Sequence, residues 1–497
     1  MIVKSGKKEG ILNKKILAKG KNVKKIFRSF LYTSNLIVLT LLIGLMFVKP
    51  DILKNGFNKV YNVVYSKNYL HYPEAVLKYF ASQFVVADYI QIDIKHMDMQ
   101  KLEYTRQKRM NGVGGESGNV FEYVPAGIRR DGQAYDAKIR LKGDRKIHYE
   151  DINKLSFRVK LDGDNTLFGM KVFSLQKPRA RNYIYEWLLL EMMKQEGIIA
   201  PEYKFINANL NGKDLGVYAL EEHYGKHLIE RYGHREGPII RFSENLRARD
   251  FRKTSILPFR KKKWMAEENV PATKRAVYLL EEFIRGKTNL AKTFDVKKLA
   301  NFYAIADLFE AHHGYLTKSL RFYHNPVTGK LEPIPFDGHY NQEKHYLLEQ
   351  GLPLGESFFI AAERGINPDP ANNYYTKVAD REYLKHIFNN PKTFDLEFFE
   401  QYIQILKKIS DPEYLDQFFE KIKEPLDYNL KMIYKNFPMD DNFSYYGPGP
   451  FYFHESLIYK KQNKIRELLK KQRESVGDIR IHGAGVGSDY ILLEILP

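Results

Sequence analysis

The sequence predicts a mixed α+β fold, with antiparallel strands in its first half and helices in its second half, preceded by one membrane helix. Short segments between residues 89 and 161 alternate apolar and polar side chains, the period of half-buried strands. Segments between residues 379 and 474 instead repeat apolar side chains at helical spacing. Near the start of the chain, residues 30–48 form a run of 19 residues without a charge.

The uncharged run, FLYTSNLIVLTLLIGLMFV, is long enough to cross about 30 Å of hydrocarbon at about 1.5 Å per helical residue. Residues 1–29 carry ten lysines and arginines against one acid, Glu9. The positive-inside rule then places the N-terminus in the cytoplasm and the main body of the protein outside the cytoplasmic membrane. A signal peptide is the alternative, but no small-residue cleavage site follows the run.

Composition limits the class of protein. A chain of 497 residues exceeds what one core usually supports, and 44% hydrophobic residues indicate a folded protein. The net charge of +19 comes in good part from the N-terminus and is accompanied by no nucleic-acid-binding motif, so we expect no nucleic-acid partner. The absence of cysteine excludes disulfides and a cysteine nucleophile, but it leaves the redox compartment open.

These patterns divide the chain into six segments. They are a basic cytoplasmic tail (1–29), a transmembrane helix (30–48), a stalk or linker (49–87), a core (88–340), a helical lobe (341–475) and a β segment that begins a further unit (476–497).

Two predicted strands carry rows of cations. In residues 137–142 and 155–161 the apolar side chains point one way and the basic side chains point the other way. The basic side chains are those of Arg140, Lys142, Arg158 and Lys160. If the strands are neighbours under a cleft, these cations form a site for a polyanion such as a nucleoside triphosphate. A solvated sheet face is the alternative.

A helix predicted over residues 181–196 is apolar nearly all round and therefore buried. It contains two carboxylates, Glu186 and Glu191, and a buried carboxylate needs a partner. Either one could pair with a strand cation and position it. A capping or surface role is the alternative for both.

Two hairpins end in ionisable residues. The first has Asn211 and Gly212 at its turn and ends at Glu221-Glu222-His223. The second has its turn at residues 325–329, so the segment 310–319 and the residues from Asp337 onward leave it on the same side. Active sites are often built this way, although loop acids and histidines are also commonly only solvated.

The order of motifs resembles the CotH family of spore-coat-type, atypical protein kinases. The motifs are VPAGIRRDGQAYDAKIRLKGD, KLSFRVKL, LFGMKVFSL, LNGKDLGVYALEE and RFYHNPVTGKLEPIPFDG, and together they span about residues 88–340. The resemblance implies a diverged protein-kinase-like fold that binds ATP with a divalent metal, Mg²⁺ or Mn²⁺, and phosphorylates serine or threonine.

The resemblance also implies roles for single residues. Asp337 falls on the metal-binding Asp of the family, and Glu222 falls on the acid that closes the hairpin. Arg158 and Lys160 lie in the basic strand that reaches the phosphates, and Glu186 or Glu191 would be the helix Glu paired with it.

The sequence departs from the family pattern in EAHHGYLTKSLRFY. Glu310 or His313 stands near the position of the catalytic Asp, and Lys318 or Ser319 replaces the following Asn. A histidine could act as base, since its ordinary pKa of about 6.5 suits proton abstraction at neutral pH. Three residues become candidates for a modified metal site beside Asp337: His339, Asn341 and Glu310.

Three functions fit these residues. The first is a membrane-anchored kinase that transfers phosphate from ATP to a protein Ser/Thr or to an acceptor in the cell envelope. The second is a catalytically inactive surface or envelope scaffold, or an adhesin, that keeps the fold. The third is a metal hydrolase built from Glu310, His312, His313, Asp337 and His339, although these residues lack a fixed metal-binding spacing.

Overall fold

The computed structural model describes residues 72–111, 122–143, 145–243, 251–311, 314, 317–338, 383, 386–388, 390, 392–436, 439–440, 449–453, 455–476, 481–486 and 491–495. The chain divides into two compact units, Met1–Leu70 and His71–Pro497, and all described residues belong to the second. In that described part, no helix is both long enough and apolar enough to span a membrane. The predicted membrane helix at 30–48 lies outside it, so the anchor stays a prediction.

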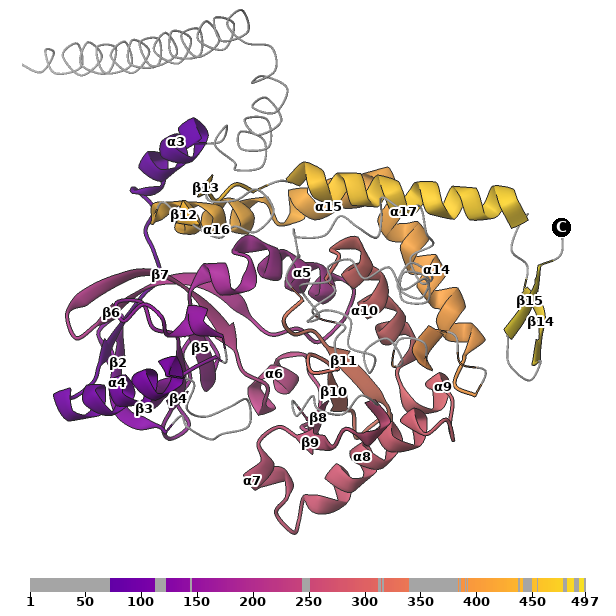
Figure 1. Cartoon of the computed structure of the whole chain (residues 1–497), viewed down its shortest axis with the longest axis horizontal. Coiled ribbons are helices and arrows are strands. Elements are labelled where there is room, and N and C mark those ends of the chain that lie inside the picture. The colour runs from indigo at the N-terminus through magenta and orange to yellow at the C-terminus, as the bar shows by residue number, and fades with distance from the viewer. Residues whose placement is uncertain are drawn as a thin grey trace, which may run out of the picture. The chain divides into compact units, whose positions relative to one another are not determined.

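Seven strands close into a barrel in the order β1-β2-β3-β4-β5-β7-β6 (Figure 1). They are β1 (Tyr89–Asp93), β2 (Val124–Arg130), β3 (Gln133–Leu141), β4 (Phe157–Leu161), β5 (Val172–Gln176), β6 (Tyr203–Leu210) and β7 (Lys213–Glu222). Neighbouring strands are antiparallel except β1 and β6, which pair in parallel and close the barrel. The antiparallel β-rich lobe is thus confirmed, with one parallel pair that the sequence did not predict.

The alternation in the sequence decides which side chains fill the barrel. Ile139, Val159, Phe173 and Leu220 come from four adjacent strands and are fully buried in one apolar cluster. Their neighbours in sequence point to the outer face, because successive side chains of a strand alternate between faces. The predicted Asn211-Gly212 turn is also confirmed, since it joins β6 to β7, and both residues have the positive φ that such a turn requires.

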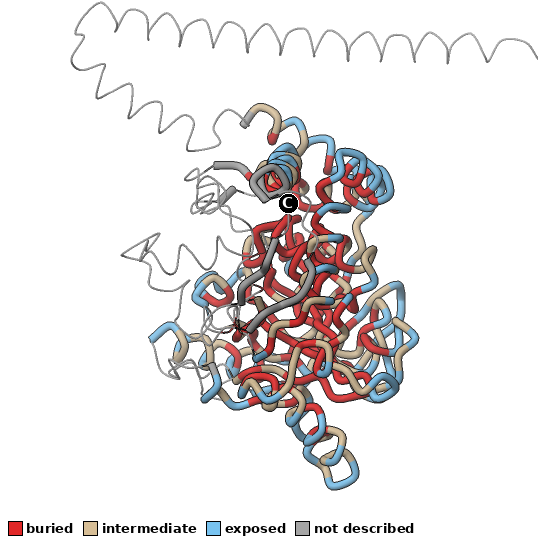
Figure 2. The backbone as a smooth tube through the Cα atoms, turned by 90° about the vertical axis from the view of Figure 1, so that its right-hand side faces the viewer, coloured by how far each residue is buried: buried red, intermediate tan, exposed pale blue. Residues whose placement is uncertain are grey.

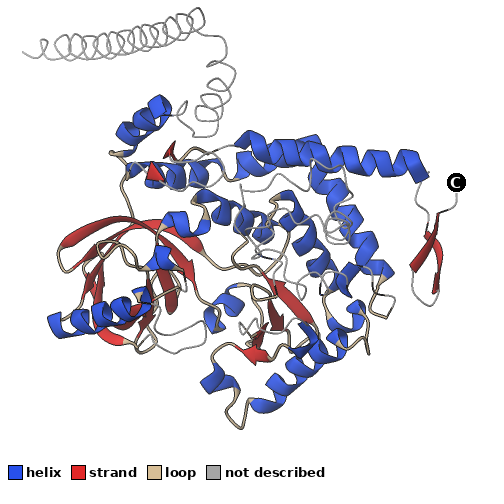
Figure 3. Ribbon diagram, in the orientation of Figure 1, coloured by secondary structure: helices blue, strands red, loops and turns tan. Residues whose placement is uncertain are grey.

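The second half of the described chain is mainly helical, with a small sheet of order β11-β10-β8-β9 (Figure 3). Its strands are β8 (Ile239–Phe242), β9 (Ile256–Pro258), β10 (Arg321–His324) and β11 (Leu331–Ile334). The larger helices are α5 (Ile184–Gln195), α8 (Val270–Ile284), α10 (Val296–Leu308), α14 (Leu396–Ser410), α15 (Pro412–Lys421), α16 (Lys423–Lys435) and α17 (Glu455–Val476). The predicted hairpin with its turn at 325–329 is present as β10 and β11, which pair antiparallel.

Shorter or peripheral elements complete the described part. They are α3 (Tyr72–Ser82), α4 (His96–Met110), α6 (Lys226–Arg231), α7 (Lys261–Trp264), α9 (Leu290–Thr293), the 3-10 helices η2 (Lys146–His148), η3 (Pro178–Arg181) and η4 (Phe251–Lys253), and the strand pairs β12 (Met439–Asp440) with β13 (Gly449–Pro450) and β14 (Ile481–Val486) with β15 (Ile491–Ile495).

One apolar core runs through the helical part and joins segments that the sequence had placed in separate units. It extends from Ala75 to Ile465 and includes α5, α10 and α14, and Figure 2 shows buried residues along the interior of the described chain. Helices before and after residue 340 therefore share this core. Part of the predicted stalk also belongs to this body, because Gln83 donates a hydrogen bond to the Lys435 carbonyl at 2.9 Å.

Helix starts follow ordinary capping chemistry. The predicted cap Asp295 accepts a hydrogen bond from the Lys298 backbone N–H at 3.0 Å, and Asp395 caps α14 in the same way. Both caps satisfy backbone donors that the first helical turn leaves unpaired.

Candidate functional site

A polar row crosses the outer face of the barrel. Arg140 on β3 lies opposite Arg158 on β4, Arg158 lies opposite Ser174 on β5, and Ser174 lies opposite Glu221 on β7. Directly opposed residues of antiparallel strands project to the same face, so these four side chains share one surface. The two cationic strands, whose pairing the sequence left open, are neighbours, and the row continues across β5 to an acid on β7.

Lys142 and Glu221 form a buried ion pair at the deep end of this surface. The Lys142 Nζ donates hydrogen bonds to the Glu221 carboxylate and, at 2.8 Å, to the side-chain oxygen of Gln176. Burial lowers the pKa of Lys142 to about 8, although Glu221 opposes the shift. Burial alone would raise the pKa of Glu221, but Lys142 and Arg181 hold it below its ordinary value. The pair is therefore charged at neutral pH.

Arg181 connects this pair to the second hairpin. Its guanidinium donates a hydrogen bond to the Asp337 carboxylate, and a second nitrogen lies 3.9 Å from Glu221. Burial would lower the pKa of Arg181, but Asp337 and Glu221 raise it, so the cation is permanent. Asp337 has a φ of 56°, a left-handed conformation that is uncommon for a residue other than glycine and that clusters at functional sites.

Glu186, on the first turn of α5, lies beside Arg181 and Asp337 and accepts a hydrogen bond from the Asp337 backbone N–H. Burial, with a smaller contribution from the carboxylates of Asp337 and Glu221, raises its pKa to about 8 against the opposing effect of Arg181. Glu186 is therefore mainly protonated at pH 7. Five ionisable side chains from four parts of the chain thus converge: Lys142, Glu221, Arg181, Asp337 and Glu186.

Arg158 lies on the same face but is not paired. Among the described residues it forms neither a hydrogen bond nor an ion pair, and its buried Nε has no partner. The adjacent Ser174 hydroxyl is also buried and has no hydrogen-bond partner among the described residues. Burial lowers the pKa of Arg158 and Glu221 raises it, but no described residue forms a hydrogen bond with its guanidinium. Arg158 and Ser174 thus offer donors that fit an anionic ligand such as a phosphate group.

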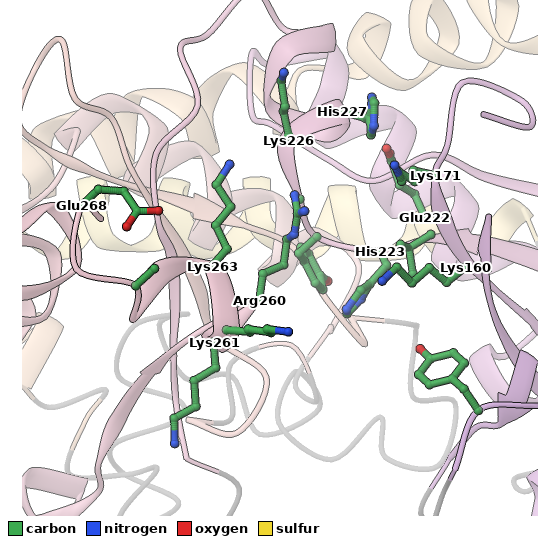
Figure 4. Close-up of a pocket in the computed structure, with 16 residues that line it drawn as sticks. Lys160, Lys171, Glu222, His223, Lys226, His227, Arg260, Lys261, Lys263 and Glu268 are labelled. Carbon is green, nitrogen blue, oxygen red and sulfur yellow. The ribbon is translucent and has the colours of Figure 1, made fainter. Parts of the chain in front are cut away.

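A basic pocket opens beside this row, with a cavity volume of about 690 Å³ (Figure 4). Lys160 and Val172 border it from β4 and β5, and His223 and Tyr224 border it from the segment that follows β7. The lining also includes cations from α6, from α7 and from the residue before α7: Lys226, Arg260, Lys261, Lys262 and Lys263. The volume is in the usual range for small-molecule sites, about 300–1,000 Å³, and the charge favours an anion.

Two predicted residues lie apart from the cluster. Glu222 borders the pocket, but its carboxylate accepts two hydrogen bonds from Arg231, at 2.6 and 2.8 Å, and one from the Glu202 backbone N–H. Glu191 forms an ion pair with Lys194 at 2.9 Å on the far part of α5. Of the two helix glutamates, it is therefore Glu186 that the fold brings to the cluster.

Glu310 follows the C-cap of α10, has a φ of 45° and forms a buried ion pair with Lys461 of α17 at 2.8 Å. Three other predicted residues, His313, His339 and Asn341, lie outside the described residues, and their roles stay predictions. Backbone contact still links the two ends of the hairpin, because a Cβ placed on Gly314 would come within 3.1 Å of the Gly338 Cα.

The predicted metal site is not completed by the residues that the structure describes. No group of three or more His, Asp or Glu side chains that could hold a metal occurs there. Asp337 supplies carboxylate oxygens of the kind that Mg²⁺ prefers, but its Oδ1 is bonded to Arg181. The described residues thus offer one ligand and not a metal centre.

Two residues of the cluster, Arg181 and Glu221, were not predicted as site residues from the sequence, and neither was Gln176, which accepts a hydrogen bond from Lys142. The sequence held half of the signal for Glu221, because Glu221 and Glu222 must face opposite sides of β7 and only one can share a face with Arg158. The strand register, which the structure supplies, decides that it is Glu221. Arg181 had no such signal, since its direction is set by the turn before α5, where Asn182 and Tyr183 both have a positive φ.

Comparison with known proteins agrees with the motif series. Residues 139–436 match the family described as CotH kinase protein, which makes the protein kinase-like. The match covers more than half of the 497 residues, so the chain belongs to the CotH kinase family. It also extends past the predicted end of the core at residue 340, as the shared apolar core would suggest. No curated protein matches the chain.

Proposed function

We propose that this protein is an ATP-dependent phosphotransferase that acts on a protein Ser/Thr or on a hydroxyl-bearing acceptor in the cell envelope. The observation that carries the proposal is the unpaired Arg158 between the basic pocket and the buried Lys142, Glu221, Arg181 and Asp337 cluster. Phosphoryl transfer depends mainly on positioning and on neutralising the phosphate charge, and this surface offers fixed cations for both.

Each residue has a distinct part in this proposal. Arg140, Arg158 and Lys160 face the triphosphate, and Glu221 holds the Lys142 ammonium in place. Asp337 is the proposed ligand of Mg²⁺ or Mn²⁺, with His339 and Asn341 as further predicted ligands. A bound divalent ion would supply positive charge to the phosphate oxygens.

The proton of the acceptor hydroxyl needs a base near Asp337. Glu310 is held by Lys461 in the described structure, which favours His313 as the proposed base. The proposed location follows from the 19-residue apolar run and the basic tail: one N-terminal membrane helix, with the catalytic body outside the cytoplasmic membrane.

The test combines nucleotide binding with label transfer on the full chain in detergent. ATP with Mg²⁺ or Mn²⁺ should raise the Tm, since ligand at 100 times its Kd stabilises by about 2.7 kcal/mol. Arg158→Met should abolish this shift. Arg129→Met should retain it, because Arg129 forms an exposed ion pair with Asp93 on another strand. No Tm shift with any nucleotide, together with no label transfer from ATP, would overturn the proposal.

A second candidate is a catalytically inactive scaffold or adhesin of the cell envelope. The ion pair between Glu310 and Lys461 favours it, because this pair occupies the carboxylate nearest to the position of the family's catalytic Asp. The same assay separates the two functions. An inactive scaffold that keeps the nucleotide site would show the Tm shift without label transfer.

A further inference from the structure

The ion pair between Glu310 and Lys461 joins the loop before β10 to a helix far along the chain. The two charged atoms are 2.8 Å apart, and the side chains are 5% and 4% exposed. Burial lowers the pKa of Lys461 to about 8, while Glu310 raises it. Lysine is rarely this buried in a protein, and buried charges occur mainly in pairs such as this one.

Lys461 lies on the apolar face of α17. Ile458, Ile465 and Leu468 stand three to four residues apart along the helix with Lys461 and are buried with it. The next residue, Gln462, fixes the helix against the end of α14 by donating hydrogen bonds to the carbonyls of Ile409, at 3.1 Å, and Asp411, at 2.5 Å. The buried neighbours of Lys461 along α17 and the hydrogen bonds of Gln462 therefore fix the position of the Lys461 side chain.

A short series of backbone contacts runs from the residue after Glu310 toward Asp337. The Ala311 N–H bonds to the Ala306 carbonyl at 2.8 Å, and the Gly314 N–H bonds to the Ala311 carbonyl at 2.9 Å. Gly314 packs on Gly338, and the Ala311 Cβ would lie 3.5 Å from a Cβ placed on Gly338. Gly338 directly follows Asp337. Ala311 and Gly314 therefore both support the backbone beside Asp337.

We propose that Lys461 is a positioning residue, which holds Glu310 and through it the loop that supports Asp337. The family match ends at residue 436, so this support comes from a helix beyond the matched region. The charge is not needed for packing alone, because a methionine would fill a similar volume on an apolar helix face. The partner of the Lys461 ammonium is Glu310, which has a left-handed backbone conformation at the turn that follows α10.

The test measures amide hydrogen exchange in the full chain, which requires no nucleotide and no activity. In Lys461→Met, the amides of Ala311, Gly314 and Gly338 should exchange about tenfold faster. Lys461→Arg should restore the protection, because it keeps the cation. The matched control is Lys460→Met, which removes an exposed lysine from the same turn of α17 and should change nothing. If Lys461→Met does not fold, Glu310→Gln removes the same charge pair with a smaller change of shape and should show the same exchange.

Faster exchange confined to α17, or spread evenly over the chain, would overturn the proposal, because it would show that Lys461 only stabilises the helix. Only a second measurement depends on the activity proposed above. If label transfer occurs, Lys461→Met should lower kcat about tenfold with an unchanged KM for ATP. Absence of label transfer in the unmodified protein would end the kinase proposal and leave the exchange result standing.

Discussion

The guanidinium of Arg181 holds the carboxylate of Asp337, 156 residues further along the chain. This contact joins the turn before α5 to the end of the β10–β11 hairpin, and Arg181 also lies 3.9 Å from Glu221 of the barrel. One cation therefore ties together the strand face, the helix and the loop that form the candidate site.

Removing Arg181 should strongly destabilise the protein. Arg181→Met leaves Asp337 and Glu221 buried without this cation, and breaking a buried pair costs about 3–5 kcal/mol. Urea unfolding should show this loss. The control, Arg129→Met, removes an exposed pair and should cost about 0–1 kcal/mol. Equal losses in the two variants would contradict a central role for Arg181.

The protonation of Glu186 should make stability depend on pH. Its pKa is about 8 in the folded chain, chiefly because of burial, against an ordinary value of 4.5. The folded state therefore holds a proton that the unfolded state has lost, and stability falls as pH rises from 4.5 to 8, by at most about 1.4 kcal/mol per pH unit. Above pH 8 the effect levels off.

Glu186→Gln should remove this dependence, since glutamine does not titrate. The variant should gain stability over the unmodified protein between pH 5 and pH 8 in urea unfolding, and the gain should be constant above pH 8. Glu191→Gln is the control on the same helix, where the carboxylate is partly exposed and paired with Lys194. A gain that does not change with pH would show that Glu186 is ionised in the folded state.

Close packing of α5 on the loop after Asp337 should make Gly338 intolerant of a side chain. A Cβ there would lie 2.4 Å from the Leu189 Cδ2, and Leu189 is buried. Gly338→Ala should cost about 1–3 kcal/mol by overpacking, and Leu189→Ala should cost about 2–5 kcal/mol by leaving a cavity. The double variant should lose less than the sum in urea unfolding. Simple additivity would show that the two residues do not touch.

The predicted orientation in the membrane can be tested with single cysteine variants, because the chain has no cysteine of its own. Val327→Cys places one thiol on the exposed turn between β10 and β11, where the side chain is 78% exposed. In intact spheroplasts, an impermeant maleimide should label Val327→Cys. It should label Ser5→Cys, in the basic tail, only after permeabilisation. The opposite pattern would reverse the orientation, and release of the protein by carbonate would exclude the membrane helix.

Local rules predicted much of the fold. The alternation in β3 and β4, the Asn211-Gly212 turn and the Asp295 cap each depend on residues within a few positions of one another, and all are present in the structure. Part of the site follows from the same rule, because Arg140 and Arg158 share a face once their strands pair. The sequence left the pairing itself open, and the structure shows it.

Contacts between distant segments could not be predicted in this way. Neither the sequence around Glu310 nor that around Lys461 shows that the two residues meet, and helical spacing at 455–474 predicted only an amphipathic helix. The sequence likewise carried no sign that α10 and α14, which lie on either side of residue 340, share one core.

The sequence by itself determined the strand faces, the turns, the helix caps and membership of a kinase-like family, because each depends on short-range stereochemistry or on an ordered series of motifs. Tertiary structure alone decided that Glu221 and not Glu222 faces the cations, that Arg181 is the link to Asp337, and that Glu310 is paired with Lys461. The physical reason is that burial makes an unpaired charge costly, so each buried charge is stabilised by whichever partner the packing of distant elements brings within reach.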